Sequence, residues 1–212
     1  MPPSFKPKLG LTSGLTLNKV KLDADNVTIN NSKGEDAVNI ISSTFNIFGL
    51  EIYNSFSDAI DLHFSEGKMG GIKIYNSGND SLELSLSNVE VDGLFIRGAG
   101  DKSLSLGERS KLRAQNLQIH HTDIAFASKD GSLFEINNIL ISDAPVGIEM
   151  FNKKPELGQT YGKLDNVSVG CVATLRLIER GLSINMNGLV HVGEVEKVSN
   201  LMYGALYGKA TK

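Results

Sequence analysis

The sequence repeats itself every 22 residues or so over most of its length. The segment GLEIYNSFSDAIDLHFSEGKM, which begins at Gly49, is followed at Gly71 by the closely similar GIKIYNSGNDSLELSLSNVEV. One isoleucine recurs at the same place in successive repeats, as Ile29, Ile52, Ile74, Ile96, Ile119 and Ile141. Self-similarity at this period is typical of solenoids, in which each repeat packs only against its neighbours.

Within each repeat the apolar residues alternate with polar ones, as in I-D-L from Ile60 and V-E-V from Val89. This alternation is the side-chain period of a β-strand. Gly, Asn, Ser and Asp residues, which favour turns, separate three such strands in each repeat. A leucine-rich repeat would need an L-x-x-L-x-L-x-x-N frame and a helical segment, and neither is present. The chain is therefore predicted to be all-β, a parallel β-helix (solenoid) of about 7–8 coils with three short strands in each coil.

Further apolar columns with the same spacing define the predicted core. One column contains Val38, Ile60, Leu82, Leu104, Phe126 and Ile148, and another contains Phe45, Gly67, Val89, Leu112 and Phe134. Over roughly residues 15–192 this repeated sequence pattern resembles the right-handed parallel β-helix family, the pectate-lyase-like superfamily. It is most similar to the non-catalytic β-helix domains near the C-terminus of secreted or surface-attached bacterial proteins. The resemblance implies an extracellular or cell-surface location and a carbohydrate-facing role.

Asparagines recur two residues after the isoleucine column, as Asn31, Asn54 and Asn76. Because side chains two residues apart in a strand point the same way, we expect these asparagines to point inward like the isoleucines. We also expect them to hydrogen-bond to one another from coil to coil. The adjacent column contains Ser32, Ser55, Ser77 and Thr122. The asparagine column is interrupted at Gly98 and continues as His121 and Asp143, which we also interpret as structural residues of a repeating bend.

The repeat pattern divides the chain into three segments. Residues 1–14, which are rich in proline, are predicted to be a linker or cap, and residues 15–192 to be the β-helix. Ile139 aligns with Val167 only at a step of 28, so a loop is expected near Lys153 and Lys154. In residues 193–212, helical spacing replaces the strand period, as in Val195, Val198, Leu201 and Met202. We expect this segment to cap the last open coil, the alternative being a helix that binds a partner.

Composition argues against several classes of function. The net charge is −3 and no basic patch is interleaved with aromatic residues, so nucleic-acid binding is not expected. No apolar run reaches the roughly 18 residues of a membrane-spanning helix. The N-terminal residues lack the apolar core of a signal peptide. Cys171 is the single cysteine, so the chain has no disulfide framework and its redox compartment stays open.

The best candidates for chemistry are four carboxylates at one edge of a predicted strand column: Asp58, Asp61, Asp80 and Glu83. Stacked strands lie about 4.8 Å apart, so the four are predicted to form one compact patch. One interpretation is a Ca²⁺ site, because this ion prefers several oxygen ligands close together, and Ca²⁺ is the one cofactor the sequence suggests. Another is glycoside chemistry, in which like charges held close together raise the pKa of one carboxyl group and leave another low, so that the two divide the acid and base roles. We favour a third interpretation, in which these are solvent-facing residues and turn residues that bond their own backbone, with Lys102 neutralising part of the patch.

The motifs of polysaccharide-active enzymes in this superfamily are incomplete. SFSDAID and SGNDSLE resemble only loosely the N-T-D and D-D motifs of polygalacturonase-type hydrolases. Arg97 or Arg113 is the rough counterpart of the arginine that pectate lyases place near calcium. The long loops that flank a catalytic groove in such enzymes are also missing, apart from the insertion near Lys153.

We therefore predict a non-catalytic scaffold or binding module that contacts polysaccharide or another domain of a larger chain. The first alternative is a polysaccharide lyase, hydrolase or epimerase, with Asp58, Asp61, Asp80, Glu83 and Arg97 as its catalytic candidates. A weaker alternative is a subunit of a trimeric fibre such as a tailspike. Such a fibre should show outward apolar strips, whereas the outward positions here are mostly charged or polar.

Overall fold

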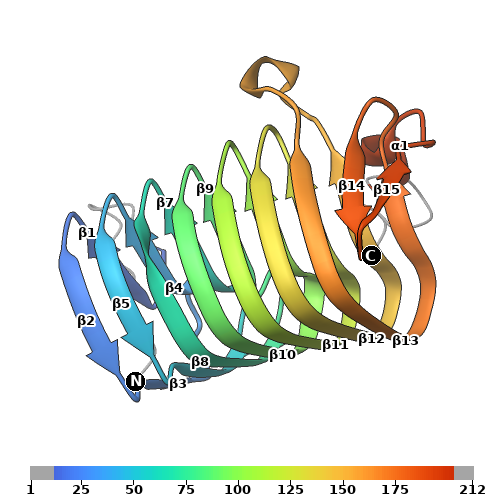
Figure 1. The fold of residues 1–212 in the computed structure, drawn as a ribbon. Coiled ribbons are helices and arrows are strands. Elements are labelled where there is room, and N and C mark those ends of the chain that lie inside the picture. The colour runs from blue at the N-terminus through green and yellow to red at the C-terminus, as the bar shows by residue number, and fades with distance from the viewer. Residues whose placement is uncertain (1–11, 203–212) are drawn as a thin grey trace.

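A computed structural model describes residues 12–202, so the predictions made for residues 1–11 and 203–212 lie outside the described range. Its strands stack in parallel into a solenoid of about eight coils, each strand pairing with one about 22 residues further along. Figure 1 shows the coils following one another in chain order from β1 to β13. The prediction of an all-β parallel β-helix is confirmed.

Each coil contributes three strand segments, so the wall of the solenoid has three faces. Face A begins with β1 (Leu15–Asn18), β4 (Asp36–Ile41), β7 (Asp58–His63) and β9 (Leu82–Ser85). Face B begins with β2 (Lys21–Asp25) and β5 (Thr44–Phe48), and face C with β3 (Thr28–Asn30) and β6 (Glu51–Ser55). Longer strands continue around the corners: β8 (Glu66–Ser77) over faces B and C, and β10 (Asn88–Gly107), β11 (Lys111–Lys129), β12 (Leu133–Phe151) and β13 (Tyr161–Ile178) over faces B, C and A.

The predicted columns form the core. Ile52 pairs with Ile74, Ile74 with Ile96 and Ile96 with Ile119, and all four side chains are fully buried. The column from Val38 to Ile148 lines face A in the same way. Because each inward residue is covered by its counterparts in the coils before and after it, one apolar core runs the length of the solenoid.

Left-handed backbone conformations turn the chain at the corners. Positive φ angles occur between faces B and C at Asn26, Gly49, Gly71, Gly93, Asn116, Asn138 and Asn166, and between faces C and A at Asn31, Asn54, Asn76, Gly98, His121, Asp143 and Cys171. Gly and Asn adopt this conformation at lower cost than other residues. A single such residue turns the chain without ending the strand ladder, which explains why β10 continues through Gly93 and Gly98.

The asparagine ladder forms, but on the outside of the corner between faces C and A. The amide of Asn54 donates to Oδ1 of Asn31 at 3.1 Å, and the amide of Asn76 donates to Oδ1 of Asn54 at 3.0 Å. All three residues are exposed, so the prediction that they point inward was wrong. Inward and outward positions alternate only within a strand, and the left-handed conformation of the asparagines interrupts that alternation.

Serine hydroxyls form the buried polar columns instead. In the predicted column beside the asparagines, Ser55, Ser77 and Thr122 are buried, whereas Ser32 is half-buried. A second buried column, which was not predicted from the sequence, lies inside the corner between faces A and B and contains Ser43, Ser65, Ser87 and Ser110. Here the backbone N–H of each serine donates to the hydroxyl of the next, at 3.1–3.2 Å. These hydroxyls give the buried corner N–H groups a partner where the strand ladder is broken.

The exposed ladder leads to a testable expectation at Asn54. Asn54→Leu should lower the free energy of unfolding by about 1–2 kcal/mol, because the variant loses two amide bonds and holds a branched side chain in a left-handed conformation. Asn54→Gly loses the same bonds but keeps the favourable backbone, so it should be more stable than the Leu variant. Urea denaturation measures both. A Leu variant as stable as the Gly variant would contradict this assignment of the corner.

The predicted insertion is a loop between faces A and B. Ile139 pairs with Val167 as expected, and the extra residues include the 3-10 helix η1 (Pro155–Leu157). Oδ1 of the buried Asp130 holds the base of the loop by accepting the backbone N–H groups of Lys153 at 2.6 Å and Lys154 at 2.7 Å.

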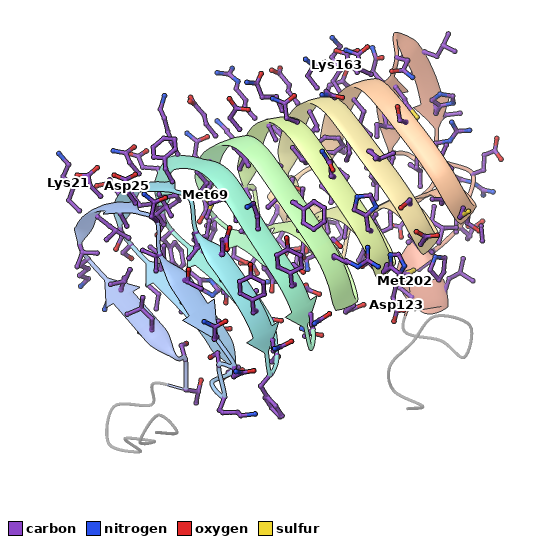
Figure 2. All side chains as sticks on the ribbon, turned by 90° about the horizontal axis from the view of Figure 1, so that it is seen from below. Lys21, Asp25, Met69, Asp123, Lys163 and Met202 are labelled. Atoms are coloured by element: carbon purple, nitrogen blue, oxygen red, sulfur yellow. The ribbon has the colours of Figure 1, made fainter. Side chains whose placement is uncertain are left out.

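The C-terminal helix lies where the sequence did not predict it. α1 (Val198–Met202) packs on the outer side of face A rather than over the open end of the last coil. Val198 and Met202 contact a cluster that contains Ile124, Val146, Phe151 and Leu177. Figure 2 shows Met202 near Asp123, on the side opposite Lys21 and Lys163 of face B. The edge of β14 (Ser183–Met186) is paired instead with the antiparallel β15 (Leu189–Val192).

Candidate functional site

The four predicted carboxylates lie on the outer side of face A. Asp58 and Asp61 belong to β7, Glu83 pairs in register with Asp61, and Asp80 lies just before β9. We refer to Asp58, Asp61, Asp80 and Glu83 as the acidic edge. The 22-residue spacing predicted that Asp58 and Asp80, and Asp61 and Glu83, lie in neighbouring coils, and the contacts of each carboxylate determine what it can do.

Asp58 and Asp80 join successive coils through the backbone. Oδ1 of Asp58 accepts the N–H of Asp80 at 2.8 Å and the side-chain amide of Asn79 at 2.7 Å. Oδ1 of Asp80 accepts the N–H of Lys102 at 3.0 Å, and Nζ of Lys102 lies 3.8 Å away. The expected bonds to their own turns are therefore replaced by bonds to the next coil, where a corner N–H needs a partner.

Asp61 and Glu83 have partners of their own. Nε2 of His63 lies 2.7 Å from Asp61 on the same strand, and this hydrogen bond raises the pKa of His63. Glu83 accepts the hydroxyl of Ser105 at 3.4 Å and lies 3.5 Å from Nζ of Lys129. Asp61 is only 9% exposed, so it does not simply face solvent as expected.

Burial sets the protonation of this region. It raises the pKa of Asp58 to about 7, although the hydrogen bonds from Asn79 and Asp80 act in the opposite direction. It raises the pKa of Asp80 to about 6, although the charge of Lys102 opposes the shift. Burial alone would lower the pKa of Lys102, but Asp80 and Asp101 hold it above its usual value. Asp58 and Asp80 therefore titrate near neutral pH, as general acids do, but Asp80 is only 4% exposed.

The arginine candidates lie on other faces. Arg97 is on face C, in register with Tyr75 and His120, and Arg113 is on face B. The ion pairs of the acidic edge involve His63, Lys102 and Lys129 instead. Within residues 12–202, no three His, Cys, Asp or Glu side chains are placed to hold a metal ion. The structure thus separates Arg97 from the carboxylates that the enzyme alternative would combine with it.

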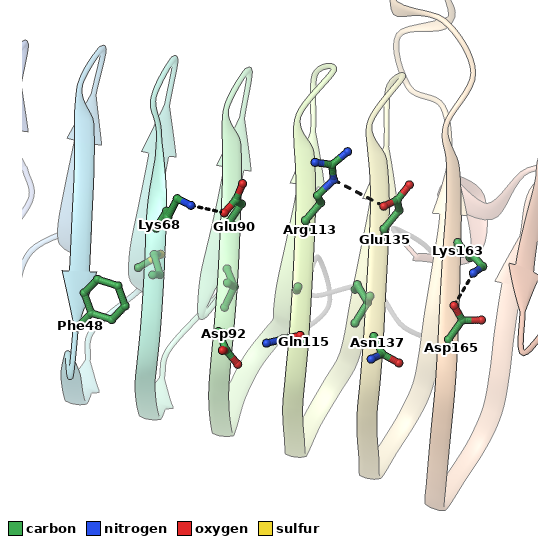
Figure 3. Close-up of a pocket in the computed structure, with 14 residues that line it drawn as sticks. Phe48, Lys68, Glu90, Asp92, Arg113, Gln115, Glu135, Asn137, Lys163 and Asp165 are labelled. Carbon is green, nitrogen blue, oxygen red and sulfur yellow. Dashed lines mark ion pairs between the residues drawn. The ribbon is translucent and has the colours of Figure 1, made fainter.

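A groove on the outer side of face B was not predicted from the sequence (Figure 3). It is shallow and open, has a volume of about 670 Å³ and crosses successive coils from β5 to β13. Its polar lining consists of Lys68, Glu90, Asp92, Arg113, Gln115, Glu135, Asn137, Lys163 and Asp165. Because every second strand residue points outward, these side chains stand in two columns that run along the solenoid axis. We refer to it as the face B groove.

Phe48 forms one end of the face B groove (Figure 3). A Cβ atom on Gly70, in the next coil, would lie 2.6 Å from Cδ1 of Phe48, so the ring lies directly over this glycine. The glycine lets the ring pack against β8, yet Phe48 remains 48% exposed. The groove therefore ends at an aromatic surface with a fixed position.

Three exposed ion pairs line the same groove. Lys68 pairs with Glu90 at 2.8 Å, Arg113 with Glu135 at 3.6 Å, and Lys163 with Asp165 at 2.6 Å. The side chains are 37–76% exposed. Ion pairs this exposed contribute only about 0–1 kcal/mol, so a ligand that offers hydrogen bonds can open them at little cost.

Face C carries a different aromatic surface. The rings of Tyr53 and Tyr75 stack in parallel with centroids 4.8 Å apart, and Phe95 and His120 continue the row with rings tilted by 42°. Stacked rings cover one another's faces and leave mainly their edges to solvent. Phe48 is therefore better placed than the Tyr53–Tyr75 stack to receive a planar ligand surface.

The sequence contained part of the signal for the face B groove. Outward polar pairs recur at one repeat position as Glu90 and Asp92, Arg113 and Gln115, and Glu135 and Asn137. Outward positions on the other faces are also polar, so this pattern does not single out one face. The distinguishing feature, Phe48 packed over Gly70, appears only when the coils are stacked.

Comparisons of the chain with protein-family models, with curated proteins and with solved structures find no match. In residues 12–202, no helix has the length and apolar character needed to cross a membrane.

Proposed function

We propose that the protein is a non-catalytic β-helix binding module that holds an extended glycan in the face B groove. The observation that carries the proposal is the composition of this groove, in which polar side chains repeat from coil to coil and end at the exposed ring of Phe48. Sites for small molecules are enclosed and mostly apolar, whereas this groove is open and nine of its fourteen lining residues are polar or charged. A polar polymer laid along the solenoid axis fits it better than a compact ligand.

Sugar chemistry matches the lining. The coils repeat about every 4.8 Å, which is comparable with the length of one sugar residue in an extended chain. Each coil therefore offers a donor or acceptor pair to one residue of the polymer. The amides of Gln115 and Asn137 can both donate and accept, as vicinal hydroxyl groups require, and the apolar face of a sugar ring can pack on Phe48.

The proposed location is extracellular or at the cell surface, where glycan polymers are found. This follows the sequence resemblance to β-helix domains of secreted and surface-attached bacterial proteins. The same resemblance supports a second partner, another domain of a larger chain. No nucleic-acid partner is proposed, because the charge is slightly negative overall.

The raised pKa values of Asp58 and Asp80 favour a second candidate, a polysaccharide lyase, hydrolase or epimerase that uses the acidic edge. Burial argues against it, because a catalytic carboxyl group must touch its substrate. Asp80 and Asp61 are almost inaccessible, and all four carboxylates already have protein partners.

Affinity electrophoresis in gels that contain neutral or acidic polysaccharides tests the proposal. We expect at least one polysaccharide to retard the protein, and Phe48→Ala to weaken this binding about tenfold, a loss of about 1.4 kcal/mol. The double variant Gln115→Ala, Asn137→Ala should weaken it further. Phe56→Ala is the matched control, since Phe56 is 72% exposed and lies outside the groove. Unretarded protein, or retardation that these variants leave unchanged, would contradict the proposal.

A further inference from the structure

Two bulky apolar residues occupy left-handed positions in consecutive coils. Phe64 and Leu86 both have φ of 51° and lie at the corner between faces A and B. The other non-glycine residues with positive φ in residues 12–202 are polar or charged, apart from Cys171. A branched or aromatic side chain in this conformation strains the backbone, whereas asparagine, which occupies many of the other corners, tolerates it.

Packing does not explain these two residues. Phe64 is 60% exposed and Leu86 is 41% exposed, so neither contributes to the core. They lie side by side, because the preceding residues, His63 and Ser85, pair in register. Together they form an apolar ridge along the corner. Strained residues that also expose apolar surface lower both stability and solubility, and such positions are concentrated at binding sites.

Glu66, two residues after Phe64, borders the ridge on face B. It lines a hollow of about 320 Å³ that also contains Glu90 and two lysines, Lys21 and Lys68. Lys68 is paired with Glu90, whereas no ion pair of the described residues involves Glu66. On the face A side, the carboxylates of Asp61 and Glu83 are paired with His63 and Lys129, so Glu66 is the carboxylate beside the ridge that is left for a cationic group. A ligand with both an apolar and a cationic group matches these surroundings.

We propose that Phe64, Leu86 and Glu66 form a docking site for a polypeptide segment that carries basic and apolar side chains next to one another. An apolar side chain covers the ridge, which removes its surface from water. A lysine or arginine lies over the ring of Phe64 and pairs with Glu66. This site differs from the glycan site in its ligand and its anchoring residues, although Lys68 and Glu90 border both.

NMR titration of the ¹⁵N-labelled protein with two short peptides, one of alternating Lys and Leu and the other of alternating Glu and Leu, tests the site. We expect the Lys–Leu peptide to shift the amides of residues 63–66 and 85–88, and the Glu–Leu peptide to leave them unchanged. The double variant Phe64→Asn, Leu86→Asn should bind the Lys–Leu peptide at least about tenfold more weakly. Phe56→Asn, at another corner, should bind it as the original chain does.

The same double variant has a readout that needs no ligand. Its melting temperature should rise, because asparagine relieves the strain at both positions, and Phe56→Asn should show no such rise. An unchanged or lower melting temperature would contradict the strain assignment and so the proposal. Equal binding of both peptides, binding that persists in the double variant, or shifts at the ridge caused by an oligosaccharide instead of the peptide would each overturn it.

Discussion

Ile74→Asp is expected to abolish cooperative folding. Ile74 is fully buried on face C between Ile52 and Ile96, in the middle of the core. The substitution removes about 2–5 kcal/mol of packing and hydrophobic stabilisation. An unpaired carboxylate in an apolar interior costs several kcal/mol more. Because a domain has only about 5–15 kcal/mol of stability, the sum is comparable with the whole.

Thermal unfolding followed by circular dichroism measures this effect. Lys73→Ser is the control on the same strand, since it removes only the exposed ion pair of Lys73 with Glu51 and should change stability by less than about 1 kcal/mol. An Ile74→Asp variant that melts like the original chain would contradict the inward column of isoleucines, and with it the stacking of the coils.

Glu149→Leu is expected to stabilise the protein. Glu149 lies on the outer side of face A, fully buried, in register between Ala127 and Leu177. In the described part of the chain, neither of its carboxylate oxygens has a hydrogen-bond partner. Its strand neighbours Val146 and Phe151 belong to the apolar cluster beneath α1. Burial raises the pKa of Glu149 to about 7, although Lys102 opposes the shift.

The raised pKa gives this prediction a pH dependence. The folded state binds the proton of Glu149 more tightly than the unfolded chain does. The protonated carboxyl group therefore makes its full contribution to the free energy of unfolding below the pKa of the unfolded chain, 4.5, and this contribution is lost as the pH rises through the folded-state pKa of about 7. Above pH 7 the buried charge destabilises the fold by about 3 kcal/mol. Asp58 and Asp80, whose pKa values are also raised, act in the same direction.

Melting temperatures between pH 5 and pH 8.5 measure the effect. Glu149→Leu should melt about 4–10 °C higher than the original chain at pH 8.5, and this advantage should shrink toward pH 5. Glu149→Gln should lose the same part of the pH dependence with a smaller gain, because the amide still lacks partners. A Leu variant less stable than the original at pH 8.5 would show that the carboxylate has a stabilising partner.

The regular part of the fold could be predicted because the chain repeats one spacing. A column such as Ile52, Ile74 and Ile96 fixes both the strand period and the stacking register. The alternation of inward and outward side chains does not hold at the corners, because the left-handed conformation of Asn54 turns its amide outward. It does not hold in the coil formed by β13 either. Arg176 pairs with the inward Ile148, while Leu177 faces outward beneath α1, an arrangement that depends on a helix distant from it in the chain.

The candidate sites differ in how much the sequence could reveal. The spacing of Asp58 and Asp80 predicted that they stack, but their bonds to the backbone of the next coil depend on where corner N–H groups lack partners. Phe48 became a candidate only when its ring was found over Gly70. Phe64 and Leu86 fit the repeat as ordinary corner residues, and their strain and exposure are properties of the folded backbone.

The central claim, that the protein binds a glycan in the face B groove without cleaving it, is tested most directly by native mass spectrometry. The protein would be incubated with a defined oligosaccharide prepared from the polysaccharide that retards it most strongly. We expect a one-to-one complex with the mass of the intact oligosaccharide, and about tenfold weaker binding of the oligosaccharide by Phe48→Ala. Shortened or unsaturated oligosaccharides, particularly if Asp58→Asn abolishes them, or equally strong binding by Phe48→Ala, would contradict the claim.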